Sequence, residues 1–166
     1  NQLFPKYIKE LQKLKENEDY ETAIASFLRI RQLPFYKNIS DSLQAVTMMT
    51  YGIVLAANQQ YNRSLDVYDE INHKYQSVLK RDIPLQARLY TEISFNHSSM
   101  GNQKKDITSV EKAIDLMESN FDKIKVMDYI AAYNNLFYYY GEYEDNVGIN
   151  KTFQKFKKVL YFSAIE

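Results

Sequence analysis

Cysteine is absent from this chain of 166 residues. The sequence therefore excludes a disulfide framework, a thiolate nucleophile and a cysteine-based zinc site. Glycine and proline are scarce as well, with four and three residues. An all-β protein built from many short strands needs more glycine and proline residues for its turns than this chain contains. The scarcity of turn residues favours a chain of long helices.

The chain also has no net charge, because Lys+Arg and Asp+Glu both number 21. A domain that binds nucleic acid by itself needs basic side chains to neutralise phosphates. We therefore expect this domain to make no direct contact with nucleic acid. The nearest approach to a basic patch is four lysines near the C-terminus, which we interpret as a solvated helix face: Lys151, Lys155, Lys157 and Lys158.

Long apolar runs are the third absence. No stretch approaches the roughly 18 residues that a membrane span requires, and the first residues show no signal-peptide pattern. We therefore predict a cytoplasmic protein without membrane contact. The length suits a single domain over residues 1–166. Because the chain begins at Asn1 rather than Met, we expect it to be a fragment of a longer protein.

Motifs for catalysis or metal binding are absent too. The two histidines, His73 and His97, fall on different predicted helices; we interpret His73 as a surface residue and His97 as a partly buried packing residue. Asp69 and Glu70 are adjacent on a helix and point apart, so they form no convergent acid pair. We predict that the chain is not an enzyme and needs neither metal nor cofactor.

An internal repeat is the clearest positive feature of the sequence. Three pairs of similar residues are each separated by 41 positions: Tyr20 and Tyr61, Ala23 and Ser64, Phe27 and Tyr68. In addition, Gly52 precedes Ser64 by 12 positions, across a polar turn. Two antiparallel helices joined by a short turn approach closely only where their side chains are small. The pattern thus predicts repeated helix pairs with small residues at the contact and an aromatic residue one turn later.

This arrangement resembles the tetratricopeptide repeat. The resemblance implies an all-α, right-handed superhelical solenoid of about four antiparallel helix pairs, with a fourth pair that departs from the strict register. The expected helices span residues 3–17, 20–33, 41–58, 61–78, 84–99, 104–119, 122–140 and 146–165.

Residues with known preferences for helix ends support these ranges. Ser40 and Asp82 stand where they can cap the helices that follow them. Pro34 is expected to stop the second helix. Gly101 and Gly141 are expected to end the first helices of the third and fourth pairs.

In tetratricopeptide-like stacks the first helix of each pair lines a concave, ligand-binding face. The family pattern places Met49, Ile53 and Ala56 of the second pair on this face. It also places there two further rows: Arg88, Thr91, Phe95 and Ser98 of the third pair, and Asp128, Ala131, Asn135 and Tyr138 of the fourth. The mixture of apolar and polar groups indicates a groove for an extended or partly helical peptide.

Asn134 and Asn135 lie in the interior of a predicted helix, where asparagine is unfavourable by propensity. An asparagine amide both donates and accepts, so it can bind the backbone of any peptide. We add both residues to the candidate ligand site; a polar helix face is the alternative. The run Phe137-Tyr138-Tyr139-Tyr140 covers a whole helix turn, so some of its rings must lie in the core and others outside it.

The long repeats and the Asn-bearing groove helix also resemble the sensor region of the Rgg/PlcR-type transcriptional regulators, which respond to peptide pheromones in Gram-positive bacteria. That resemblance implies peptide binding here and DNA binding by a separate N-terminal domain. A general protein-interaction scaffold is the first alternative. The second is a homodimerisation module, whose interface would use aromatic residues of the last helix: Phe153, Phe156, Tyr161 and Phe162.

Overall fold

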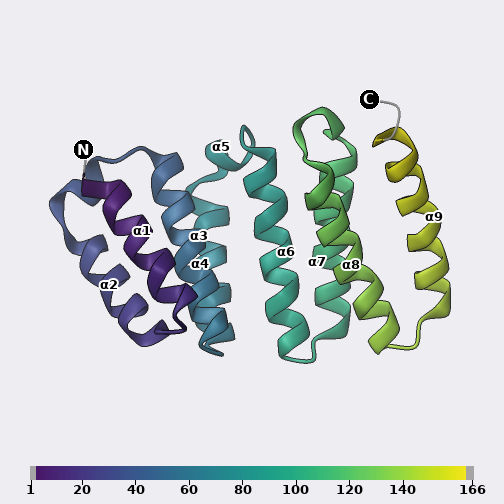
Figure 1. Ribbon diagram of the computed structural model, residues 1–166, viewed down its shortest axis with the longest axis horizontal. Helices are drawn as coiled ribbons and strands as arrows, with labels where there is room; N and C mark the ends of the chain where they lie inside the picture. The colour runs from purple at the N-terminus through teal and green to yellow at the C-terminus, as the bar shows by residue number, and fades with distance from the viewer. Residues whose placement is uncertain (1–2, 164–166) are drawn as a thin grey trace. The chain divides into compact units, whose positions relative to one another are not determined.

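The computed structural model describes the backbone of residues 3–163, and every regular element in this range is a helix. The all-α helical-repeat prediction is therefore confirmed. The chain divides into two compact units, Asn1–Arg81 and Asp82–Glu166, each built from antiparallel helix pairs (Figure 1). Among the described helices, none has the length and apolar character needed to cross a membrane.

The first unit contains two helix pairs, and a short helix follows the second pair. The elements of this unit are α1 (Leu3–Glu16), α2 (Tyr20–Gln32), the 3₁₀ helix η1 (Pro34–Asn38), α3 (Asp41–Ala57), α4 (Tyr61–Lys74) and α5 (Gln76–Leu79).

The pair α3 and α4 shows why the repeat requires small residues. The Ser64 hydroxyl donates to the Gly52 carbonyl oxygen at 2.8 Å, and Tyr68 is fully buried beside the same glycine. A Cβ atom added to Gly52 would lie 2.3 Å from the Tyr68 ring, so no larger residue fits there. The close contact expected from the 12-residue spacing is present.

The second unit also contains two helix pairs. The elements of this unit are α6 (Ile83–Ser99), α7 (Gln103–Glu118), the 3₁₀ helix η2 (Phe121–Lys123), α8 (Val126–Glu142) and α9 (Asn146–Ser163). In the pair α6 and α7, the Ser94 hydroxyl donates to the Asp106 carbonyl oxygen at 2.9 Å, again 12 positions away. Here the serine lies on the first helix, the reverse of its place in α3 and α4.

The pair α8 and α9 keeps the glycine–tyrosine contact but exchanges the helices that carry its two members. Tyr140 lies on the first helix and Gly148 on the second, and a Cβ atom on Gly148 would lie 2.4 Å from the Tyr140 ring. A repeat search expects the small residue on the first helix. The fourth pair therefore carries its tyrosine before its glycine in the sequence, the reverse of the order in α3 and α4.

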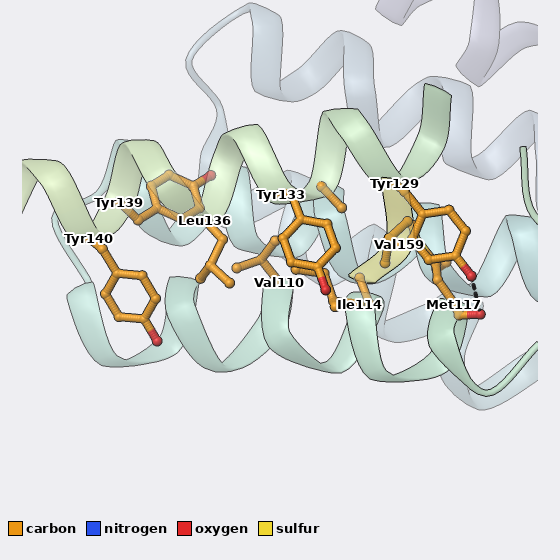
Figure 2. Packing of buried hydrophobic residues seen from close by; sticks show 12 residues of the cluster. Val110, Ile114, Met117, Tyr129, Tyr133, Leu136, Tyr139, Tyr140 and Val159 are labelled. Carbon is orange, nitrogen blue, oxygen red and sulfur yellow. Dashed lines mark hydrogen bonds between the residues drawn. The ribbon is translucent and has the colours of Figure 1, made fainter. Parts of the chain in front are cut away.

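A row of tyrosines attaches α8 to α7 (Figure 2). Tyr129 and Tyr133 are fully buried, and Tyr140 is 7% exposed. The Tyr129 hydroxyl donates to the Met117 carbonyl oxygen at 2.6 Å. The Tyr133 hydroxyl donates to the carboxylate of Glu118, and the Tyr140 hydroxyl donates to that of Glu111 at 3.0 Å. Each ring thus buries apolar area while its hydroxyl keeps a partner.

Most of the expected helix ends are confirmed. The Ser40 side chain accepts from the Leu43 amide, and the Asp82 side chain accepts from the Leu85 amide. The second helix ends at Gln32, two positions before Pro34. Gly101 follows α6 with a φ of 72°, in the left-handed region that glycine adopts without strain.

Three boundaries differ from the expected ranges. α4 ends at Lys74 rather than at 78, because the buried Tyr75 turns towards α3 and donates to the Gln44 side chain at 2.9 Å. α8 begins at Val126 rather than at 122, because Ile124 and Lys125 are extended. Gly141 does not end α8, which continues to Glu142.

Candidate functional site

The first helices of the second unit, α6 and α8, each carry a row of side chains at the same spacing. On α6 the row is Arg88, Thr91, Phe95 and Ser98, and on α8 it is Asp128, Ala131, Asn135 and Tyr138. Steps of three, four and three residues place the side chains of each row on one face of its helix. On α8 this face differs from the one that carries the tyrosine row. The two rows line two hollows, which together we call the α6–α8 groove.

The first hollow has a volume of about 450 Å³ and lies beside the N-terminal halves of α6 and α8. Its walls are mostly apolar, and three charged side chains lie among them. The lining residues are Asp82, Pro84, Leu85, Ala87, Arg88, Thr91, Met117, Ile124, Asp128, Ala131 and Ala132.

The charges of the first hollow are unbalanced. The Arg88 guanidinium lies 3.5 Å from the Glu92 carboxylate, one helix turn away. Its positive charge therefore already has a partner. The carboxylates of Asp82 and Asp128 also line the hollow, and both residues are exposed. Among the lining side chains two carboxylates stand against one guanidinium, so their summed charge is negative.

The second hollow has a volume of about 510 Å³ and lies beside the C-terminal halves of the same two helices. Two aromatic residues are accessible at its surface, Phe95 at 48% and Tyr138 at 59% exposure. Apart from one glycine, the other lining residues supply hydroxyls, one amide and one carboxylate. They are Ser98, Ser99, Gly101, Asn135, Tyr139, Glu142 and Tyr143.

Tyr143, which lines the second hollow, belongs to a polar cluster. The Tyr143 hydroxyl donates to the carboxylate of Asp106, which is fully buried. Burial raises the pKa of Asp106 above its ordinary value, although the hydrogen bond from Tyr143 opposes the shift. Burial, together with the charge of Lys105, lowers the pKa of His97. Among the described residues, the buried Nδ1 atom of His97 has no hydrogen-bond partner.

The structure brings five of the eight candidate residues to the groove. Arg88 and Thr91 line the first hollow, and Phe95, Asn135 and Tyr138 line the second.

The other three candidates lie elsewhere. Asn134 is exposed and lines neither hollow. Met49 and Ile53 belong to α3 in the first unit, where Met49 is 2% exposed and Ile53 is half-buried. The candidate site is therefore built from the second unit alone.

Sequence reasoning missed the two ends of the groove. Pro84 lies four residues before Arg88, and Glu142 lies four residues after Tyr138. Both line the groove. Extending the spacing of each row by one helix turn finds both residues. Asp82 and Tyr143 lie at helix ends, where no periodic pattern applies.

Within residues 3–163, no three His, Cys, Asp or Glu side chains are grouped so that they could hold a metal ion. His73 is exposed, and its Nδ1 atom lies 3.2 Å from the carboxylate of Asp69.

Comparison with known proteins adds little to this description. No family model matches the chain, and no curated protein matches it. Among solved structures the chain is similar to one described as "MamA RS-1 ArsTM double mutant". That similarity has a TM-score of 0.39 and 16% identity, and it covers 98% of this chain and 97% of the other. A likeness at this level carries no conclusion about function.

Proposed function

We propose that this chain binds an extended peptide, or an extended segment of a protein partner, along the α6–α8 groove. The observation that carries the proposal is the alignment of two hollows between the same two helices. Apolar walls with a few convergent polar groups are typical of ligand sites. Two hollows in a line are the arrangement expected for a chain with several side chains rather than for a compact small molecule.

The dimensions of the groove support an extended ligand. Arg88 and Phe95 are seven residues apart on α6, and Asp128 and Asn135 are seven residues apart on α8. Seven helical residues rise about 10.5 Å. An extended chain covers that distance in about three residues. The amide of Asn135 lines the second hollow, where it can donate to and accept from the backbone of a peptide.

A finer proposal concerns the biological setting. The resemblance to Rgg/PlcR-type regulators supports a role as the cytoplasmic sensor domain of a bacterial transcriptional regulator, with DNA binding by a domain outside this sequence. Gene context tests this directly. We expect a helix-turn-helix coding segment upstream in the same reading frame, or a gene for a short secreted peptide beside it; an intact unrelated frame upstream contradicts the assignment.

Self-association through α9 is the alternative function, and one observation favours it. Phe153 and Tyr161 are 50% and 68% exposed on α9, and Leu160 is 42% exposed between them. Phe156, by contrast, packs its half-buried ring against Tyr133 and Phe137 of α8. Phe162 lies outside the described side chains. A homodimer formed through this face is expected to dissociate on dilution. Light scattering over a range of concentrations tests it, and a strict monomer excludes it.

The groove proposal is tested by filling the first hollow. Ala131 is exposed and lines that hollow, so Ala131→Phe places a ring in the path of the ligand. Ala25, exposed on α2 in the first unit, provides the matched control Ala25→Phe. The probe is a mixture of fluorescein-labelled random nonapeptides, and binding is followed by fluorescence anisotropy.

The expected result is binding to the unmodified protein and to Ala25→Phe, with at least a tenfold loss in Ala131→Phe. Circular dichroism must show equal helix content in all three proteins. Two outcomes overturn the proposal: no binding of the random peptides to the unmodified protein, or equal binding to both variants.

A further inference from the structure

The charge of the first hollow suggests which side chain it accepts. Two of its three charged residues are acidic, Asp82 and Asp128, and the third, Arg88, lies beside Glu92. Three basic residues are sequence neighbours of lining residues, Arg81 before Asp82 and Lys123 and Lys125 on either side of Ile124, and none of the three lines the hollow. A cationic group placed here gains two favourable partners, whereas an anionic group meets two like charges.

The walls of the same hollow fit a long aliphatic chain. Pro84, Leu85, Ile124, Ala131 and Met117 line it without any charge of their own. Lysine and arginine join an apolar stem to a charged head, and they commonly bury the stem while the head stays near water or a carboxylate. A hollow with apolar walls and two exposed carboxylates matches both parts of such a side chain.

The second hollow has a different preference. The accessible rings of Phe95 and Tyr138 offer contact to an apolar or aromatic side chain. The second hollow lies about seven helical residues further along α6 and α8 than the first. This distance corresponds to about three residues of an extended ligand.

We propose that the groove selects a basic segment, in which a lysine or arginine enters the first hollow and an apolar or aromatic residue about three positions away enters the second. This inference rests on the proposed function, because it specifies the ligand of the same groove. Charge complementarity with Asp82 and Asp128 is the observation that carries it.

The experiment compares three pools of fluorescein-labelled nonapeptides. One central position is fixed as lysine, norleucine or glutamate, and the other positions are random. Norleucine keeps the aliphatic stem and removes the charge, so the lysine pool and the norleucine pool differ in the cation alone. We expect the lysine pool to bind about three- to tenfold more tightly than the norleucine pool in 50 mM salt. The preference should shrink in 300 mM salt because exposed charges are screened.

Two variants locate the preference. Asp128→Asn removes one carboxylate, and Asp82→Asn removes the other while keeping an N-cap, because asparagine caps helices about as well as aspartate. We expect the double variant to bind the lysine and norleucine pools equally. Asp66→Asn, an exposed residue of α4 in the first unit, makes the same change of charge outside the groove and should leave the preference intact.

The outcomes separate this inference from the proposed function. If every pool binds but lysine has no advantage, the basic-ligand inference is wrong and the peptide groove stands. The inference also fails if lysine is preferred but the double variant keeps that preference. In this experiment the absence of binding in all three pools overturns the proposed function itself, and the inference falls with it.

Discussion

The two faces of α8 use the same residue type for different purposes. On one face, Tyr129 and Tyr133 are fully buried, and their hydroxyls donate to partners on α7. On the other face, Tyr138 is 59% exposed and lines the second hollow. Tyr139, the next residue, is 3% exposed. The run Phe137-Tyr138-Tyr139-Tyr140 is therefore divided between core and groove, as a helical period requires.

The comparison shows what distinguishes a structural tyrosine from a ligand-binding one. A structural tyrosine buries its ring and has an intramolecular hydrogen-bond partner, so its removal costs stability. An exposed groove tyrosine contributes little to folding, and a bound ligand can use its area. Substitutions on the two faces should therefore separate stability from binding.

The largest effect is expected on the buried face. Tyr133→Ala removes a fully buried ring and the hydrogen bond to Glu118, so it should lower the free energy of unfolding by about 3–5 kcal/mol. Tyr138→Ala, on the groove face, should change it by less than about 0.5 kcal/mol. Urea unfolding followed by circular dichroism measures both. Similar losses in the two variants contradict the division of α8 into two faces.

The next effect concerns the glycine that allows α9 to approach the tyrosine face. Gly148→Ala places a Cβ atom 2.4 Å from the Tyr140 ring, and such overpacking should cost about 1–3 kcal/mol. Gly141 provides the control, because no described atom beyond its own helix backbone and chain neighbours lies within 4 Å of an added Cβ atom. Gly141→Ala should stabilise the protein by about 0.4–1 kcal/mol. Thermal melts should show opposite signs for the two variants, and a shared sign is evidence against close packing at Gly148.

The buried tyrosine face should also make the protein sensitive to alkali. Burial, followed by the neighbouring Glu111 carboxylate, raises the pKa of Tyr140 from 10.0 to about 12. In the unfolded chain this phenol ionises near pH 10, whereas in the folded protein it stays neutral. Its contribution to stability is therefore complete below pH 10 and is lost as the pH rises from 10 to 12.

Tyr140→Phe isolates this contribution. At pH 8 the variant should be less stable by about 1 kcal/mol, because the hydrogen bond to Glu111 is lost. Between pH 8 and 11 it should lose less stability than the unmodified protein, by on the order of 1 kcal/mol. Urea unfolding at the two pH values measures the difference. Equal losses in both proteins show that the phenol of Tyr140 does not resist ionisation.

The tyrosine face and the groove face differ in how far the sequence could predict them. Helix periodicity and the 41-residue offset identified the helix pairs and the buried positions of Ser64 and Tyr68, because close helix packing leaves a repeated pattern of small and aromatic residues. The fourth pair was harder to predict. Its glycine and tyrosine exchange helices, so a search for a fixed order does not find Gly148 against Tyr140.

The groove was predictable only where its residues follow a helical period. Arg88, Phe95 and Tyr138 follow from that period. Asp82 lies at a helix end instead, and its position depends on how α6 begins. Met49 follows the helical period of the expected groove face but is not exposed there. Packing in the first unit leaves it 2% accessible, and the helical period alone does not predict such burial.

The smallest effect on stability, and the sharpest test of the groove face, comes from two adjacent asparagines. Asn135 lines the second hollow, whereas Asn134 is exposed outside it. Neither substitution by alanine should destabilise the helix, because alanine has the higher helix propensity.

If the Asn135 amide holds a ligand backbone through two hydrogen bonds, Asn135→Ala should weaken binding of the nonapeptide mixture about tenfold. Asn134→Ala should leave that affinity unchanged. Anisotropy titrations measure the affinity of each variant, and thermal melts measure its stability. If Asn135→Ala lowers the melting temperature but leaves the affinity unchanged, the Asn135 amide stabilises the fold and does not bind the ligand.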